Sequence, residues 1–420
     1  MTTRRRIVEW GKNILIVLLA CSAVTLAVMA SADDVSGGTT LLGRLSTWLG
    51  TGETPDIARA DAHVQAAALP VAVSVQSQAG RYSALYDAAA LSDAYARFGG
   101  LLGQALESAG SAQPSAMSAV REALTQQSVY FAYPGAVPLA ALASWLDATY
   151  EGGDRAAWFV LSVRSDAVLL YFGQDDEAFV CKTYLQAERL SRETARSRPD
   201  GTAFAFEQAE LSSLEPLTLL DLSGAWPVRA ISAESAWSDG FVSDTASGLG
   251  FNPYGDGYYT DADGTLVFSE SGCTLRIGTD GRIRLSNQLP DDPRFAGEGE
   301  DLCAQIETAR ALLAHLTDGR TGEAALYLTD ADDDGGITRL TFEYFVGGIP
   351  VELPDGPAAA VTLTGGTVTE LSVRVRAYAA GAAAESLLPV RQAAALTKTG
   401  RLRVGYADSG DPTPDVGWMD

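Results

Sequence analysis

The side chains that could serve as a general base or a metal ligand are few in this sequence. Only two histidines, His63 and His315, occur among the 420 residues. A Ser-His-Asp triad or a histidine-rich metal site would depend on one of two imidazoles that lie far apart in the chain. His315 falls on or beside the apolar stripe of a predicted helix, where a lone histidine is typical of packing or capping. We therefore predict that the chain is not an enzyme and holds no cofactor.

The four cysteines indicate neither a metal site nor a complete disulfide framework. Cys21 lies inside an apolar stretch, and Cys181, Cys273 and Cys303 follow it without a C-x-x-C or another metal-binding spacing. Cys273 and Cys303 could form a disulfide if this part of the chain lies outside a cell. Free buried thiols are the favoured interpretation, and the pairing stays open.

One acidic segment imitates the start of a calcium-binding loop. Asp330, Asp332, Asp334 and Gly335 reproduce the opening of an EF-hand loop, whose alternate carboxylates converge on one cation. The twelfth position is Thr341 instead of a bidentate glutamate, and the flanking residues have the pattern of strands. We interpret the segment as the acidic tip of a hairpin, with weak calcium binding as the alternative, and we predict no metal site.

Three tyrosines lie close together near the middle of the chain. Tyr254, Tyr258 and Tyr259 flank Gly255 and Gly257 in a segment with the composition of an exposed loop. Such a segment suits a contact with another protein. Packing of the tyrosines into a core is nevertheless the favoured interpretation. No G-x-S-x-G, P-loop, H-E-x-x-H or G-x-G-x-x-G motif accompanies them elsewhere in the sequence.

The elements that must position these side chains are helices and antiparallel strands. Residues 63–205 form the first predicted domain, and its strand at Val71, Val73 and Val75 ends at Gly80. Its further elements are a helix over 91–108, a helix that opens at Pro114 after a Ser111 cap and covers 117–126, a helix over 139–149, and three strands between 157 and 183.

Two further domains are predicted after the first. A central β-rich domain covers 206–298, where Asp263-Gly264, Ser271-Gly272 and Asp280-Gly281 are turn signals between alternating apolar runs. A C-terminal domain covers 299–420 and begins with a helix that Gly319 stops, before a long antiparallel meander. One helix across one sheet face defines the fold class as α+β.

Charge excludes nucleic acid as a partner. The formal net charge is −23, although Arg4, Arg5, Arg6 and Lys12 outnumber Glu9 by three positive charges at the N-terminus. The remainder of the chain is therefore even more acidic and repels phosphate backbones and anionic lipid headgroups.

An apolar stretch near the N-terminus decides where the rest of the chain lies. Residues 14–32 carry no charge. As a helix, a stretch of this length is just long enough to cross a bilayer. Basic residues in 1–13 and acidic residues after Ala32 place the N-terminus in the cytoplasm and the bulk of the chain outside, beyond a linker at 33–62. Two alternatives are cleavage after Ala30-Ser31-Ala32 and a lipoprotein signal at Cys21. We favour a retained transmembrane helix.

Several stretches together resemble the YycH/YycI family of membrane-anchored regulators from Gram-positive bacteria. "RRRIVEWGKNILIVLLACSAVTL" resembles the single anchor of the family, and "FNPYGDGYYTDADGTLVFSESGCTLRIGTDGRIRL" is similar to its central strand pattern. "ITRLTFEYFVGGIPVEL", "AAVTLTGGTVTELSVRVRAY" and the closing "LRVGYADSGDPTPDVGWMD" resemble its C-terminal sheet. The likeness is one of layout and short patterns, and residues 63–205 match least well.

The resemblance implies a regulator without catalytic residues. Members of the family contact an essential sensor histidine kinase of cell-wall metabolism through the transmembrane helix and the extracellular domains. Related YycH/YycI-type proteins are further expected partners. The helix would then pack through its small residues, which are Ala20, Ser22, Ala23 and Ala27.

Two other classes of function stay open at the level of sequence. The main alternative is an exported module that binds a peptide, a wall polymer or a secreted protein at a strand edge. A hydrolase is a third interpretation, but it lacks a recognisable nucleophile and base.

Overall fold

The computed structural model describes residues 67–223, 228–255, 257–289, 292–384 and 386–420, with backbone alone at 383 and 384. These residues belong to one compact unit, Asp61–Asp420. The predicted transmembrane helix at 14–32 with its four small residues, the linker at 33–62, and His63 lie outside the described residues. No helix in the described ranges is both long enough and apolar enough to span a bilayer. The three domain limits stay predictions.

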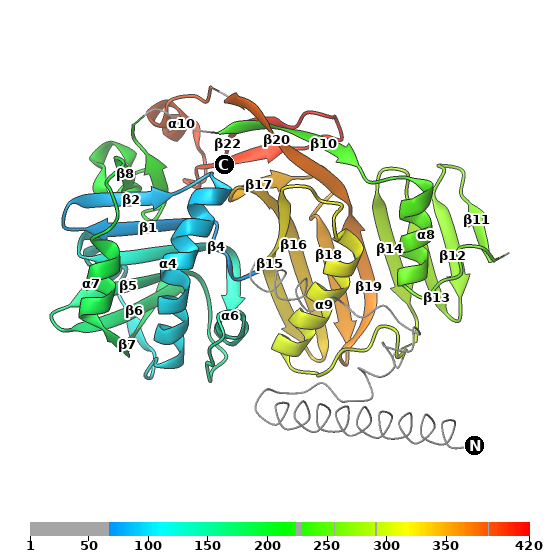
Figure 1. Cartoon of the computed structure of the whole chain (residues 1–420), viewed down its shortest axis with the longest axis horizontal. Helices are drawn as coiled ribbons and strands as arrows, with labels where there is room; N and C mark the ends of the chain where they lie inside the picture. The colour runs from blue at the N-terminus through cyan, green and yellow to red at the C-terminus, as the bar shows by residue number, and fades with distance from the viewer. Residues whose placement is uncertain (1–66, 224–227, 256, 290–291, 385) are drawn as a thin grey trace, which may run out of the picture. The chain divides into compact units, whose positions relative to one another are not determined.

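A seven-stranded antiparallel sheet forms the N-terminal part of the described chain, in the order β2-β1-β4-β5-β6-β7-β3 (Figure 1). Its strands are β1 (Ala72–Ser77), β2 (Gly80–Ala84), β3 (Gln113–Ser115), β4 (Ser128–Pro138), β5 (Arg155–Arg164), β6 (Ala167–Gln174) and β7 (Glu177–Gln186). The helices packed on it are α4 (Ala88–Glu107), α5 (Met117–Thr125), α6 (Leu139–Trp145) and α7 (Ala187–Thr194).

Alternation of buried side chains explains why both faces of this sheet are covered. Phe131 of β4 and Phe159 of β5 point to the face where α4, α6 and α7 pack. Their neighbours Tyr130 and Trp158 point to the opposite face, against α5 and the short ribbon of β8 (Thr202–Phe204) and β9 (Leu219–Asp221). The Asp87 side chain starts α4 by accepting a hydrogen bond from the backbone N–H of Ala90, at 2.8 Å.

An eleven-stranded sheet forms the second large element of the unit. Its order is β11-β12-β13-β14-β19-β18-β16-β17-β21-β22, with β15 also paired to β16, and all pairs except β17–β21 are antiparallel. The strands are β11 (Tyr258–Thr260), β12 (Leu266–Glu270), β13 (Cys273–Ile277), β14 (Arg282–Asn287), β15 (Ala324–Asp334), β16 (Ile337–Val346), β17 (Ile349–Glu352), β18 (Ala359–Thr364), β19 (Thr367–Arg374), β21 (Arg403–Ala407) and β22 (Asp415–Met419).

Helices pack on one face of the large sheet, and the opposite face is polar over β13, β14 and β19. Ile306, Ala309 and Leu313 of α9 (Leu302–Thr317) share a core with inward residues of β16 and β18. α8 (Asp239–Gly248) packs beside α9 on the same core. The side chains between the inward residues of β13, β14 and β19 therefore point away from that core.

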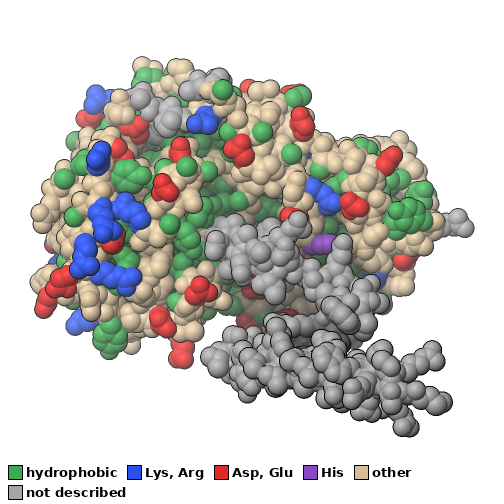
Figure 2. All heavy atoms as spheres, viewed as in Figure 1, with side chains coloured by type: hydrophobic (Ala, Val, Ile, Leu, Met, Phe, Trp, Pro, Cys, Tyr) green, Lys and Arg blue, Asp and Glu red, His purple; other side chains and the backbone are tan. Residues whose placement is uncertain are grey.

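Short elements complete the unit. They are β8 (Thr202–Phe204), two 3-10 turns η2 (Ala205–Glu207) and η3 (Ala209–Leu211), β9 (Leu219–Asp221), β10 (Arg229–Ser235), β20 (Arg376–Ala384) and α10 (Val390–Leu396). β10 pairs with β20 as a separate antiparallel ribbon. On the face drawn in Figure 2, basic side chains gather over the region of α7, while acidic side chains are spread over the remainder.

The predicted α+β class is confirmed, with seven α-helices on several antiparallel sheets in the described ranges. The Asp263-Gly264, Ser271-Gly272 and Asp280-Gly281 turns join β11 to β14 as consecutive hairpins, as predicted. Three predictions were wrong in detail, and they concern the start of α5, the end of α6 and the last long strand.

Each wrong prediction has a local reason. Pro114 lies in strand β3 and not in a helix, because residues 113–115 pair with β7. The N-cap of α5 is Ala116, which has no capping side chain, and not Ser111 as predicted. α6 ends at Trp145 because Asp147 has a positive φ of 54°. The stretch "VTELSVRVRAY" is two strands, because the chain leaves the large sheet at Val375 and joins β10.

Candidate functional site

The three tyrosines are exposed, so the prediction that they pack in the core was wrong. The exposed fractions are 86% for Tyr254, 45% for Tyr258 and 53% for Tyr259. Only Tyr258 leans on the core, with its ring 5.3 Å from that of Phe268. β11 pairs with β12 alone and is therefore an edge strand of the eleven-stranded sheet. No other described strand covers its outer side, so its side chains stay exposed.

Other residues singled out in the sequence occupy peripheral places. His315 is exposed in the last turn of α9, beside Gly248 of α8. Asp330, Asp332 and Asp334 lie on β15 at the hairpin with β16, as interpreted from the sequence, and Gly335 and Gly336 make the turn with positive φ. The described ranges contain no group of three or more acidic, histidine or cysteine side chains that could hold a metal ion.

The cysteines of the described part are free thiols. Cys181 and Cys273 are buried, and Cys303 is half-buried. Cys273 donates toward Asn287 and Asp292, and the Arg294 guanidinium lies 3.0 Å from its sulfur. Hydrogen bonds from Arg294 lower the pKa of Asp292 to about 2. This cluster holds the end of β14 against the segment before α9.

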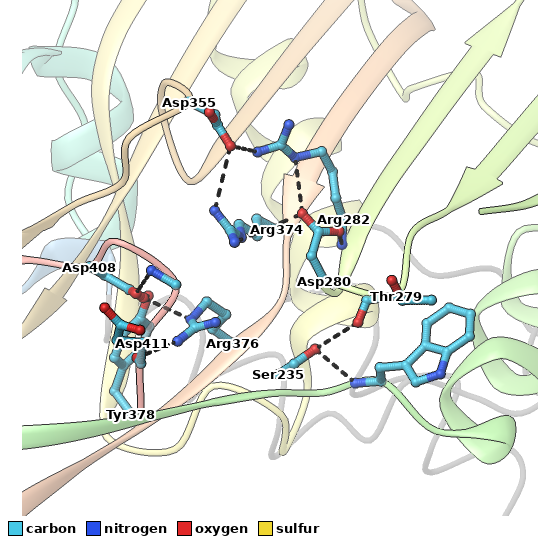
Figure 3. Close-up of polar contacts among 12 residues, drawn as sticks. Ser235, Thr279, Asp280, Arg282, Asp355, Arg374, Arg376, Tyr378, Asp408 and Asp411 are labelled. Carbon is cyan, nitrogen blue, oxygen red and sulfur yellow. Dashed lines mark hydrogen bonds and ion pairs between the residues drawn. The ribbon is translucent and has the colours of Figure 1, made fainter. Parts of the chain in front are cut away.

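The chemistry of the described molecule gathers instead on the polar face of the large sheet, where four arginines face each other across strands. Arg276 of β13 is the direct partner of Arg284 of β14, and Arg282 of β14 is the direct partner of Arg374 of β19. Like charges in register repel each other, so this arrangement needs negative charge nearby. Figure 3 shows Arg282 and Arg374 with Asp280 and Asp355 around them.

Arg374 is buried without a close partner. It is 9% exposed, and its Nε and Nη1 atoms have no hydrogen-bond acceptor. Its nearest carboxylates are those of Asp280 and Asp355, each at 3.8 Å, which is beyond hydrogen-bond length. Arg282 is better satisfied, since its Nη2 donates to Asp355 at 2.8 Å. A buried guanidinium with free donors is an uncommon and costly arrangement.

Two cavities open beside these arginines and share Arg282 and Arg284. One of about 110 Å³ is also lined by Ser372 and Arg374. The other, of about 240 Å³, is also lined by Arg276 and by the turn at Asp280. Arg284 is exposed, and no hydrogen bond or ion pair to another described residue holds it. Its charge is therefore available to either cavity.

Gly281 fixes the position of this turn. Its φ is +83°, and a Cβ there would lie 2.4 Å from the backbone oxygen of Val375. The Val375 N–H in turn donates to the Gly281 carbonyl at 2.9 Å. Only glycine allows both the left-handed conformation and this close approach. The contact sets the ends of β14 and β19 side by side and brings Arg282 against Arg374.

A second arginine, immediately beyond Val375, is held in the opposite way. Arg376 is 4% exposed, and its Nε lies 2.7 Å from the Asp408 carboxylate, although the angle is poor for a hydrogen bond. Its Nη2 donates to the Asp411 carbonyl at 3.1 Å, and Tyr378 donates to Asp408 at 2.8 Å (Figure 3). Burial and the Asp408 carboxylate raise the pKa of Tyr378 above its usual range.

A larger cleft lies elsewhere in the same unit. It has a volume of about 640 Å³, and its lining combines apolar residues such as Trp158 and Pro350 with charged ones such as Asp175, Glu215 and Arg401. The indole N–H of Trp158 is buried and has no acceptor. Clefts that combine apolar walls with polar groups are typical of binding sites for organic ligands or peptides.

Comparison of the chain with protein-family models, with curated proteins and with solved structures gave no match. The function is therefore inferred from the sequence and from the contacts described above.

The arginine face, which consists of Arg276, Arg282, Arg284 and Arg374, had a signal in the sequence that a search for motifs misses. Arg282 and Arg284 alternate with buried Ile283 and Leu285, which places both on one face of a strand. The same alternation predicts that Arg374 and Arg376 lie on one face of a single strand. This prediction is wrong, because β19 ends at Arg374 and β20 begins at Arg376. Which strands lie side by side is a property of the tertiary fold.

Proposed function

We propose that the chain is a non-enzymatic, membrane-anchored regulator of a sensor histidine kinase, with its α+β body outside the cytoplasm. The resemblance to the YycH/YycI family and the uncharged residues 14–32 support this proposal. A retained helix would hold the body beside another membrane protein, and the body's acidity would keep it off anionic headgroups.

The structural observation that carries the proposal is the exposed tyrosine edge, defined as Tyr254, Tyr258 and Tyr259 on and before β11. Aromatic side chains supply much of the binding energy at protein interfaces, and an edge strand offers unpaired backbone groups to a partner strand. All three residues of β11 are exposed. This edge therefore supplies the ectodomain contact that a regulator of a membrane kinase requires.

Regulation through the anchor follows from linkage. A helix can shift a kinase between two signalling states only by packing differently against each of them. Ala20, Ser22, Ala23 and Ala27 would allow a close approach of helix backbones in the bilayer. A second protein of the same type would bind through the same surfaces.

The test is photo-crosslinking in intact cells. A photoreactive residue is placed in turn within 14–32, at Tyr254 and at Tyr259, and captured proteins are identified by mass spectrometry. A sensor histidine kinase should be captured from both regions. The matched control is Tyr184, which is 92% exposed on β7 of the seven-stranded sheet, whereas the tyrosine edge belongs to the eleven-stranded sheet. Capture of the kinase from Tyr184 alone, or of none from 14–32, contradicts the proposal.

The cleft at Trp158 favours a second candidate, an exported module that binds a peptide, a wall polymer or a secreted protein. Trp158 lines this cleft, and its buried indole N–H is a donor without an acceptor that a small rotation of the ring would offer to a peptide carbonyl. Exchange of residues 14–32 for an unrelated apolar helix of equal length separates the two candidates. The regulator loses its effect on kinase signalling, whereas a binding module keeps its activity with any anchor.

A further inference from the structure

We propose that the arginine face binds a phosphate-type oxyanion, with Arg282, Arg284, Arg374 and Ser372 as its ligands. This inference concerns the described body and does not depend on the regulator proposal. The site is the cavity of about 110 Å³ between β14, β18 and β19, continued by the cavity of about 240 Å³ at the Asp280 turn.

The cross-strand register is the first argument. Both arginine pairs, Arg276 with Arg284 and Arg282 with Arg374, are direct neighbours on antiparallel strands. Direct cross-strand neighbours have their Cβ atoms about 4.5–5.5 Å apart, a spacing at which like charges destabilise a sheet. Asp261 pairs with Arg276 at 3.0 Å and Asp355 pairs with Arg282 at 2.8 Å, whereas Arg284 pairs with no described residue. An anion between the two strands would remove the repulsion.

The unsatisfied donors of Arg374 are the second, independent argument. Two of its three guanidinium nitrogens have no hydrogen-bond acceptor although the residue is more than nine-tenths buried. Arg374 lines the smaller cavity together with Arg282 and Arg284. Buried donors are nearly always paired in folded proteins, with protein, water or ligand. The free donors of Arg374 therefore point to an acceptor that enters the cavity.

The balance of charge selects the class of ligand. Three arginines and one aspartate, Asp355, line the smaller cavity. The larger cavity adds Arg276 and two aspartates, Asp263 and Asp280. Planar guanidinium groups bind the oxygens of phosphate in pairs, and Ser372 adds a neutral donor. A cavity of this volume accepts one small tetrahedral anion, and the adjoining larger cavity leaves room for a substituent. The strongly acidic chain repels a nucleic acid as the carrier of that phosphate.

Two sources share this chemistry, free inorganic phosphate and a single phosphodiester group. Isothermal titration calorimetry of the full chain in detergent, with inorganic phosphate and with dimethyl phosphate as probes, distinguishes them. Saturable binding of phosphate alone assigns the site to the free ion. Saturable binding of both probes assigns it to phosphodiesters. No saturable binding of either probe overturns the proposal.

Arg284→Gln is the diagnostic variant, because this exposed side chain supports no contact whose loss would unfold the protein. We expect it to weaken phosphate affinity by about tenfold or more, the usual scale for one charge-assisted hydrogen bond. Arg339→Gln is the matched control. Arg339 lies on the same outward face, two strands from β19, and its partner is Asp332 at 3.8 Å. Equal loss of affinity in both variants, or none in Arg284→Gln, contradicts the assigned site.

Discussion

Arg374 and Arg376 are two residues apart, both buried, and held in opposite ways. Arg376 contacts a fully buried carboxylate at 2.7 Å, and that carboxylate also accepts a hydrogen bond from Tyr378. Arg374 has carboxylates only at 3.8 Å and leaves two nitrogens without an acceptor. Val375, where the chain passes from one sheet to the other, lies between them.

The difference teaches how the same residue type can stabilise a fold or remain available for a ligand. A buried ion pair at 2.7 Å, whose carboxylate also accepts hydrogen bonds from Tyr378 and from the backbone N–H of Gly410, is a structural joint, which here ties β20 to the loop after β21. A buried guanidinium beside a cavity keeps its donors for an anion and gives up stability in the free protein. We expect substitutions at the two places to affect different measurements, stability at Arg376 and binding at Arg374.

The largest effect is expected from Asp408→Ala. Removal of this carboxylate leaves the Arg376 guanidinium buried without a counter-charge, which costs about 3–5 kcal/mol of the free energy of unfolding. Urea unfolding of the purified chain measures this loss. The matched control is Asp355→Ala, whose side chain is 57% exposed, and it should cost about 1 kcal/mol or less. Similar costs for the two variants would contradict the distinction between the clusters.

A second test compares two buried tyrosines that donate to different acceptors. Tyr378 donates to the charged Asp408 at 2.8 Å, and Tyr344 donates to the neutral backbone carbonyl of Arg374 at 2.9 Å. Tyr378→Phe should therefore cost about 1.5–3 kcal/mol and Tyr344→Phe about 0.5–1.5 kcal/mol in urea unfolding. Both side chains are fully buried, so the two substitutions change packing equally. A larger loss of unfolding free energy in Tyr344→Phe than in Tyr378→Phe would contradict a stabilising role of the hydrogen bond from Tyr378 to Asp408.

The sequence predicts the fold of this protein better than its candidate site. Turn residues such as Asp280-Gly281 locate the hairpins because their backbone geometry is local. The class α+β followed from the alternation of apolar residues. The site did not follow, because Arg374 and Asp355 meet only through the order of β14, β19 and β18 in the sheet. Local pattern also failed at the tyrosine edge, since exposure depends on which strand ends the sheet.

A third arginine-aspartate pair, Arg294 with Asp292, makes a contribution to stability that depends on pH. Hydrogen bonds from Arg294 hold the pKa of the buried Asp292 at about 2 in the fold, below the ordinary value of about 3.9 in the unfolded chain. Because the folded pKa is the lower one, this contribution to stability is present above about pH 4 and is lost as pH falls toward about 2.

Asp292→Asn removes that contribution, and we expect a cost of about 1–2 kcal/mol at neutral pH. The variant should also lose part of the acid sensitivity that the unmodified chain has between about pH 4 and pH 2. Thermal unfolding across this pH range measures both effects. Asp244→Asn is the control, because this carboxylate is 67% exposed beside Arg320 and should change neither property. An unchanged acid profile in Asp292→Asn would contradict the structural role.

The smallest change in stability is expected from Asp280→Asn, which nevertheless sharpens the comparison most. Its carboxylate is 44% exposed and lies 3.8 Å from Arg374, so its loss should cost less than about 1 kcal/mol. Asparagine keeps the oxygen that accepts the backbone N–H of Arg282, and the turn should survive. Without this competing charge, phosphate should bind a few-fold more tightly in calorimetry. Asp332→Asn, a carboxylate on the same face outside both cavities, should leave that affinity unchanged. A weaker affinity in Asp280→Asn would mean that the carboxylate positions the arginines and does not compete with the anion.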